Sequence, residues 1–170
     1  MAKPREVDFG QWNEMVDSFH NESDRGAAIL AGSFAENALG HYLRFRMRDQ
    51  KVADALFAPL GPLSSFSQRI AIAYAFGLIP EQRYRDFELI RKIRNHFAHH
   101  PMDTTFATEE VQKAAAGLSM METANEHKES RPGYRARTAY LLTCGISCGS
   151  LLDAMEKANA KAQANAKKDV

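Results

Sequence analysis

The sequence has no long hydrophobic run and none of the short motifs that mark most enzyme classes. No apolar run approaches the ~20 residues that span a bilayer, and residues 1–6 lack the apolar stretch of a secretory signal. It contains no glycine-rich phosphate loop, no nucleophile elbow and no His-Glu-x-x-His zinc motif. These absences predict a cytoplasmic protein that has no membrane contact and needs no cofactor.

Cysteine is scarce, because the chain has only Cys144 and Cys148. They lie four residues apart on a predicted helix and share a stripe with several leucines. A disulfide at that spacing within one helix is geometrically poor, and a metal site would need more ligands nearby. We interpret both cysteines as small core residues.

The net charge is also small. A value of +1 from 22 basic and 21 acidic residues argues against a protein that coats nucleic acid without specificity. Basic side chains still gather in three clusters: Arg44, Arg46, Arg48 and Lys51; Arg83, Arg85, Arg91, Lys92 and Arg94; Arg131, Arg135 and Arg137. We interpret the first and third as solvated helix faces. The second cluster is the candidate for function.

The remaining pattern is almost entirely helical. A chain of 170 residues fits one domain, and we find neither the alternation of strands nor an internal repeat. Helices are predicted at residues 7–20, 24–47, 52–57, 65–76, 80–99, 109–118 and from 134 into the 150s, with a loop at 119–133. The expected fold is an all-α bundle of four or five main helices in residues 1–155, followed by an Ala/Lys-rich tail at 156–170.

Capping residues mark the predicted ends of these helices. Ser23 offers an N-cap for the helix 24–47, and Ser65 with Gln68 forms a capping-box pattern. Gly77 ends that helix and Pro80 fits the first turn of the next one. Pro101 then sets the end at His99, because the residue before a proline is disfavoured in a helix.

The most informative segment is Arg94-Asn95-His96-Phe97-Ala98-His99, at the end of the helix 80–99. On a wheel of ~100° per residue, Arg94 falls inside the apolar stripe of its helix. Glu36 falls inside the apolar stripe of the helix 24–47 in the same way. We predict that Glu36 and Arg94 pair across the bundle. Two interpretations stay open: a structural ion pair that fixes helix register, or a carboxylate that aims Arg94 at a phosphate.

His99 lies at the C-terminus of its helix, where the negative end of the dipole favours a protonated imidazole. Such a residue suits chemistry in which a proton is held and released, and Asn95 adds a neutral hydrogen-bonding group nearby. A step of five residues separates Arg94 and His99 by about 140° on a continuing helix. They converge on one ligand only if the helix ends between them or if two chains pair.

His96 and His100 share a helix face, and their spacing also suits zinc. No acidic or cysteine partner lies close to them in the sequence, so we predict no metal site. We also find no helix-turn-helix pattern of a short helix, a tight glycine turn and a polar recognition helix.

Two stretches of the sequence closely resemble the mannitol operon repressor family. The matching residues are Gly61-Pro62-Leu63, Phe66-Ser67, Arg69-Ile70, Tyr74, Gly77-Leu78-Ile79, Leu89-Ile90-Arg91, Arg94-Asn95 and Phe97-Ala98-His99. The resemblance covers roughly residues 23–155. That family is similar in turn to the HEPN superfamily of helical proteins, which is marked by an Arg-x4-6-His motif. Arg94 and His99 occupy its two positions, and Asn95 its usual polar position.

The resemblance implies a homodimer with both motifs at one interface cleft, and it implies two functions. The first is a regulator of the mannitol repressor type that lacks a recognisable DNA-binding motif and acts through protein or nucleic-acid contacts. The second is a metal-independent endoribonuclease of the toxin or defence type, in which His99 helps the ribose 2′-hydroxyl attack and Arg94 stabilises the phosphorane. A partner-binding module is a third interpretation.

The expected site therefore has defined members. Arg94, Asn95 and His99 form its centre, with Glu36 as the orienting group. Arg91, Lys92, His96 and His100 form an edge that contacts nucleic acid, either RNA or DNA. The protein partners implied are an antitoxin-like protein for the nuclease and a component of the transcription machinery for the regulator.

Overall fold

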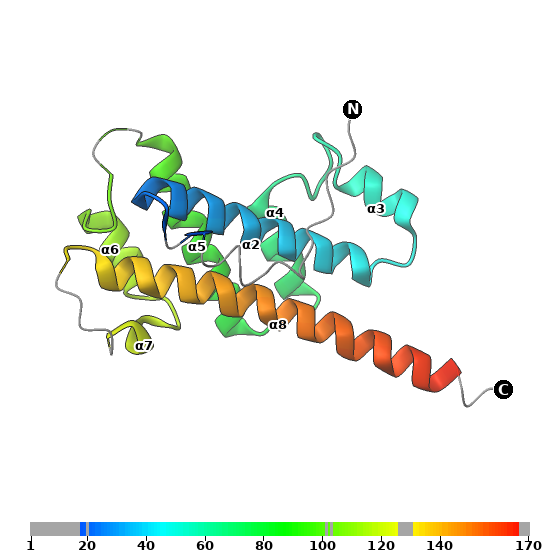
Figure 1. The fold of residues 1–170 in the computed structure, drawn as a ribbon. Coiled ribbons are helices and arrows are strands. Elements are labelled where there is room, and N and C mark those ends of the chain that lie inside the picture. Colours follow the sequence, from blue (N-terminus) through cyan, green and yellow to red (C-terminus); the bar gives the residue numbers. More distant parts are fainter. Residues whose placement is uncertain (1–17, 20, 101, 103, 126–130, 167–170) are drawn as a thin grey trace.

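The structure, a computed structural model, describes residues 18–19, 21–100, 102, 104–125 and 131–166. All regular structure in this described part is helical, which confirms the predicted all-α class. The helices are α2 (Asp24–Arg46), α3 (Gln50–Leu56), α4 (Phe66–Ala75), α5 (Glu81–His99), α6 (Glu109–Ala115), α7 (Met121–Asn125) and α8 (Tyr134–Ala166). Figure 1 shows α2 and α8 side by side, with α5 and α4 packed across them and the end of α8 projecting beyond the bundle.

The inner face of α2 is rich in alanine and glycine, which lets neighbouring helices approach closely, and its large buried residues are Phe34, Leu39, Tyr42 and Leu43. The small buried residues of this face are Ala27, Ala28, Ala31, Gly32, Ala35, Ala38 and Gly40. A Cβ added at Gly32 would lie 2.5 Å from the Tyr140 hydroxyl and 2.9 Å from the Arg94 Cβ. Gly32 is therefore the point where α2, α5 and α8 come together.

The helices α2 and α8 run in the same direction, as the colours of Figure 1 show. Near their starts, Arg137 of α8 pairs with Asp24 of α2 at 2.7 Å. One turn further, the Tyr140 hydroxyl donates to the Ala28 carbonyl at 2.7 Å. These two bonds fix the register of α8 on α2.

The predicted capping residues act largely as expected. The Ser23 side chain accepts from the Gly26 N–H, and Ser65 with Gln68 forms the complete capping box. Gly77 adopts a φ of 63°, a left-handed conformation that suits glycine. Pro80 differs from the prediction, since its extended backbone makes it the N-cap and α5 begins one residue later. The helix ends at His99 as predicted, while Pro101 lies outside the described residues.

Several helix boundaries differ from the prediction. Helix α3 begins at Gln50, two residues before the predicted start. The short helix α7 lies within the predicted loop 119–133, where a polar sequence gives no apolar periodicity to mark it. Helix α6 ends at Ala115, before the predicted residue 118. Helix α8 continues to Ala166, because its Ala-, Lys- and Gln-rich end consists of strong helix formers. The predicted helix 7–20 lies mostly outside the described residues, within which Phe19 packs against Phe34.

The third basic cluster is not a purely solvated face, and that interpretation was wrong for Arg137. Its side chain is only 6% exposed. Besides Asp24, it donates to the Phe19 carbonyl at 3.0 Å and to the Glu22 carbonyl at 2.6 Å. A cation that replaces its hydration shell with these acceptors can be buried, so Arg137 holds the segment before α2 on the start of α8. In the first cluster, by contrast, Arg46, Arg48 and Lys51 are exposed.

Helix α8 is a core helix with two buried thiols. The span Tyr134–Asn165 is long and apolar enough to cross a membrane by length and composition, and half of its most apolar window is buried inside the protein. Cys144 and Cys148 are both free and buried, as predicted. Burial raises the pKa of each thiol, so both stay protonated at neutral pH and lack the thiolate that a nucleophile needs.

A buried carboxylate ties α5 to the turn after α6 and to α8. Asp86 is fully buried and accepts from both the N–H and the hydroxyl of Ser119, at 3.0 and 2.8 Å. Arg83 pairs with Asp86 at 3.2 Å and also donates to the Ser147 hydroxyl of α8 at 3.0 Å. The charge of Asp86 is thus matched by an arginine and two further donors, the condition for a stable buried carboxylate.

We predict that Asp86→Ala lowers the free energy of unfolding by about 3 kcal/mol, because it leaves Arg83 and two Ser119 donors without their acceptor. In thermal denaturation, this corresponds to a melting temperature about 10 °C lower. Glu81→Ala is the control, since Glu81 is 61% exposed in its pair with Arg85, and we expect it to change stability by less than about 0.5 kcal/mol. Equal melting temperatures for the two variants would contradict this role of Asp86.

Candidate functional site

The candidate site lies on the last two turns of α5. The apolar stripe predicted for this helix, Phe87, Ile90, Ile93 and Phe97, is fully buried. It sets the rotation of α5 in the bundle, so that side chains at its edges face α2 on one side and α6 on the other. The regular angular spacing of side chains on a helix then determines which residues of the predicted site can contact each other.

Arg94 faces α2, where it meets Glu36. The Arg94 Nη1 donates to the Glu36 Oε2 at 2.6 Å, which confirms the predicted pair. The side chains of Glu36 and Arg94 are 17% and 21% exposed, so the pair is largely shielded from water. The guanidinium also lies over the face of Phe66, at 5.5 Å from the ring centroid. A carboxylate, an aromatic face and the backbone of Gly32 thus fix the direction of Arg94.

A second arginine shares Glu36, and sequence reasoning assigned it no role. The Arg69 Nη1 lies 3.5 Å from the Glu36 Oε1, and the rest of its guanidinium donates to the carbonyls of Leu63 and Ser64. Burial lowers the pKa of Arg69, Glu36 acts in the opposite direction, and the charges of Arg44 and Arg94 lower it further. In the sequence, Arg69 is marked only as a charged residue beside the apolar Ile70. That pattern is too common in helices to identify a site.

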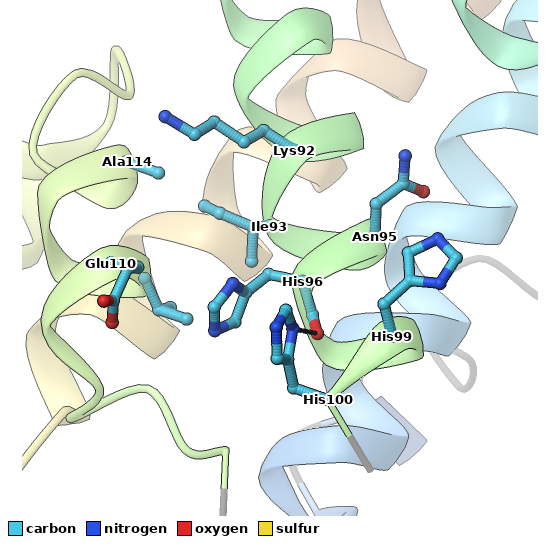
Figure 2. Close-up of a pocket in the computed structure, with 9 residues that line it drawn as sticks. Lys92, Ile93, Asn95, His96, His99, His100, Glu110 and Ala114 are labelled. Atoms are coloured by element: carbon cyan, nitrogen blue, oxygen red, sulfur yellow. Dashed lines mark hydrogen bonds between the residues drawn. The ribbon is translucent and has the colours of Figure 1, made fainter.

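His99 does not meet Arg94 within one chain. Figure 2 shows His99 and Asn95 together on the side of α5 toward α2, at the exposed end of the helix. His99 is exposed and forms no hydrogen bond with any residue that the structure describes. Arg94 is held inward by Glu36. This is the separation of about 140° expected for a helix that continues through both residues.

His96 and His100 lie on the other side of α5, toward α6 (Figure 2). Their rings stack with centroids 4.3 Å apart, and the His100 Nδ1 lies 3.0 Å from the His96 carbonyl. They border an open pocket of about 220 Å³ between α5 and α6, lined by Lys92, Ile93, Asn95, His96, His99, His100, Glu110, Val111 and Ala114. Ile93, Val111 and Ala114 are buried and form its floor.

The predicted nucleic-acid edge is divided between two sides of the helix. Lys92, His96 and His100 line the pocket, whereas Arg91 is not among its lining residues and pairs with Glu88 at 2.7 Å. The Arg91 Nε is buried and has no hydrogen-bond partner. Within the described part of the chain, no three His, Cys, Asp or Glu side chains gather as a metal site.

The end of α5 is anchored by a residue that the sequence analysis missed. The Arg25 Nη2 donates to the His100 carbonyl at 2.7 Å, and the Thr104 hydroxyl donates to the same carbonyl at 3.0 Å. A guanidinium on a terminal carbonyl also stabilises the negative end of the helix dipole. Arg25 thereby fixes the turn that carries His99 and His100.

These features define a class: a protein that is all-helical in its described part and presents an ion-paired arginine and a histidine-rich helix end. Residues 44–143 match the family described as mannitol repressor, more than half of the chain. The chain therefore belongs to the mannitol repressor family and is a regulatory protein of that type. No curated protein sequence matches it.

Two solved structures share the fold. One is a possible transcriptional regulator, YggD, from Shigella flexneri 2a, with a TM-score of 0.67 and 15% sequence identity over 82% of this chain and 96% of the other. The second is a chain of the MtlR–HPr complex from Escherichia coli, with a TM-score of 0.65 and 19% identity over the same shares. At these identities, the likeness shows a common helical architecture.

We predict that Glu36→Ala lowers the free energy of unfolding by about 2 kcal/mol, because Arg94 and Arg69 then lose their shared carboxylate in a largely shielded place. The partial exposure of all three side chains keeps the loss below that of a fully buried pair. Urea denaturation measures the effect, with Asn37→Ala as the control at the neighbouring exposed position. An unchanged denaturation midpoint for Glu36→Ala would rule out a stabilising pair.

Proposed function

We propose that this protein regulates by contact, through the helix end that carries Arg94, Asn95 and His99. The observation that carries the proposal is the family match, which spans residues 44–143 and includes all of α5. Arg94 supplies a fixed cation whose planar fork suits a phosphate. Asn95 and His99 supply hydrogen-bonding groups that lie together at the end of the same helix (Figure 2).

The proposed contact with nucleic acid uses the phosphodiester backbone. Arg91, Lys92, His96 and His100 add positive or protonatable groups around the centre of the site. Lys92 and His100 are exposed and can reach phosphates, while Arg91 pairs with Glu88 at 2.7 Å. With a formal net charge of +1, the protein needs this local concentration of charge to bind an anionic polymer.

We also propose a protein partner of the HPr kind. The chain in the MtlR–HPr complex from Escherichia coli has the same architecture over 82% of this chain. Regulation through a bound protein needs no DNA-reading helix, and the sequence contains no helix-turn-helix pattern to supply one. We place the protein in the cytoplasm and propose that it works as a homodimer, in which a second copy brings another His99 to the same cleft.

We predict that the protein binds a fluorescent double-stranded DNA, as measured by anisotropy. The logarithm of the binding constant should fall linearly with the logarithm of the salt concentration, because phosphate contacts release counterions. Arg94→Gln should reduce that slope by about one. Arg85 is exposed and lies near the start of α5, far from the site, so Arg85→Gln should change the slope less. If the protein binds no DNA and does bind HPr in calorimetry, regulation proceeds through protein contact alone.

A second candidate is a metal-independent endoribonuclease, with placement in the HEPN superfamily. The supporting observation is the pair of an arginine held by a carboxylate and an exposed histidine five residues later, at the end of one helix. His99 would move the proton of the ribose 2′-hydroxyl, and Arg94 would stabilise charge on the phosphorane. Because the two side chains point apart within one chain, this activity requires a dimer. An antitoxin-like protein would then be the partner.

We predict for this candidate that the purified protein cleaves total RNA in EDTA and leaves 2′,3′-cyclic phosphate ends. His99→Ala should lose the cleavage, and the control His41→Ala on α2 should retain it. Light scattering at micromolar concentration should show a dimer. Intact RNA with the wild-type protein, or a monomer that still cleaves RNA, would count against the composite site.

A further inference from the structure

Two guanidinium groups share the carboxylate of Glu36. The Arg94 Nη1 donates to the Glu36 Oε2 at 2.6 Å, and the Arg69 Nη1 lies 3.5 Å from the Glu36 Oε1. All three side chains are at most about one-fifth exposed, at 17% for Glu36, 21% for Arg94 and 13% for Arg69. One negative and two positive charges therefore lie together where water screens them weakly. The group carries one uncompensated positive charge.

The two arginines differ in how many of their donors are used. Arg69 donates through its Nε to the Leu63 carbonyl at 2.9 Å and through its Nη2 to the Ser64 carbonyl at 3.3 Å. Its guanidinium also lies over the ring of Phe57, 5.1 Å from the centroid. Arg94 uses Nη1 alone, and its Nε and Nη2 have no hydrogen-bond partner among the described residues. The uncompensated charge is therefore available at Arg94.

The stem of Arg94 cannot easily turn away from this arrangement. A Cβ on Gly32 would lie 2.9 Å from the Arg94 Cβ and 3.1 Å from its Cδ, so the stem rests directly on the backbone of α2. Because the Arg94 stem and its Nη1 are both fixed, the two remaining nitrogens, Nε and Nη2, have a defined direction. Pre-organised donors on a planar fork suit an oxyanion such as a phosphodiester.

We propose that Arg69 is a positioning residue that keeps Arg94 free to bind phosphodiesters. A carboxylate alone with Arg94 can accept from two of its nitrogens in a bidentate pair, which neutralises the guanidinium and occupies its fork. The Arg69 Nη1 donates to the Glu36 backbone carbonyl at 3.5 Å and lies 3.5 Å from the Glu36 Oε1, so its charge acts on the same carboxylate that Arg94 contacts through a single bond to the Oε2. Glu36 therefore cannot neutralise both arginines. This inference rests on the proposed contact between Arg94 and nucleic acid.

The test measures binding of a fluorescent single-stranded DNA oligonucleotide by anisotropy at low salt. DNA lacks the 2′-hydroxyl, so it stays intact whether or not the protein cleaves RNA. Arg69→Gln should weaken binding about tenfold, because Glu36 then neutralises Arg94. Arg44→Gln is the matched control: Arg44 also lies over Phe57, at 4.4 Å, but it pairs with Asp54. We expect it to weaken binding about twofold.

The double variant Arg69→Gln/Glu36→Gln separates positioning from a purely structural role. It restores the net charge around Arg94, so its affinity should return to within about threefold of the wild type. If Arg69 merely held the carbonyls of Leu63 and Ser64, removal of Glu36 would not restore binding. A double variant as weak as Arg69→Gln, or an Arg69→Gln variant equal to Arg44→Gln, would overturn the inference.

Two further variants keep the outcome interpretable. If circular dichroism shows that Arg69→Gln does not fold, Glu36→Gln alone must bind the oligonucleotide more tightly than Asn37→Ala, and equal or weaker binding overturns the inference. Arg94→Gln tests the underlying function. If it binds as the wild type does, the proposed phosphodiester contact at Arg94 fails. If Arg94→Gln loses affinity while Arg69→Gln keeps it, only the role of Arg69 fails.

Discussion

The close approach of α2 to α5 and α8 is the constraint on which the other features depend. It requires the alanine and glycine face of α2, because a side chain at Gly32 would collide with Tyr140 and Arg94. The short distance lets Glu36 reach Arg94 from the neighbouring helix and lets the Tyr140 hydroxyl bind a backbone carbonyl of α2. A larger side chain on that face would separate the helices and break both polar contacts at once, in addition to its steric cost.

The sequence predicted the elements whose signals are local. Capping residues indicated the ends of α4, and the proline that follows α5 indicated its end at His99. The helical wheel placed Glu36 and Arg94 on facing stripes. It gave no indication of Arg25, Arg69 or Arg137. Each of these arginines donates to backbone carbonyls. Arg25 donates to the carbonyl of residue 100, Arg69 to those of residues 63 and 64, and Arg137 to those of residues 19 and 22. A carbonyl is present at every position, so no residue pattern identifies the acceptor before the chain is folded.

The end of α5 offers two different surfaces. Arg94 is held inward against α2 by a carboxylate, while His99 is exposed at the helix end. On the side toward α6, His96 and His100 stack beside an apolar floor. The chain belongs to the mannitol repressor family, and the proposed contact with another macromolecule would use this end of the helix. One surface has the charge for a phosphodiester, and the other has the mixed polar and apolar character of a protein interface.

The parallel packing of α2 and α8 also has a consequence for the order in which the protein folds. Asp24 and Arg137 are separated by 113 positions in the chain, and two parallel neighbours need a long connection between them. During synthesis, α2 emerges before both of its main neighbours, and its inner face packs against α5 first and is completed only when α8 follows. Contacts so distant in sequence slow folding. A nascent chain interrupted before α8 would therefore lack the helix that completes its core.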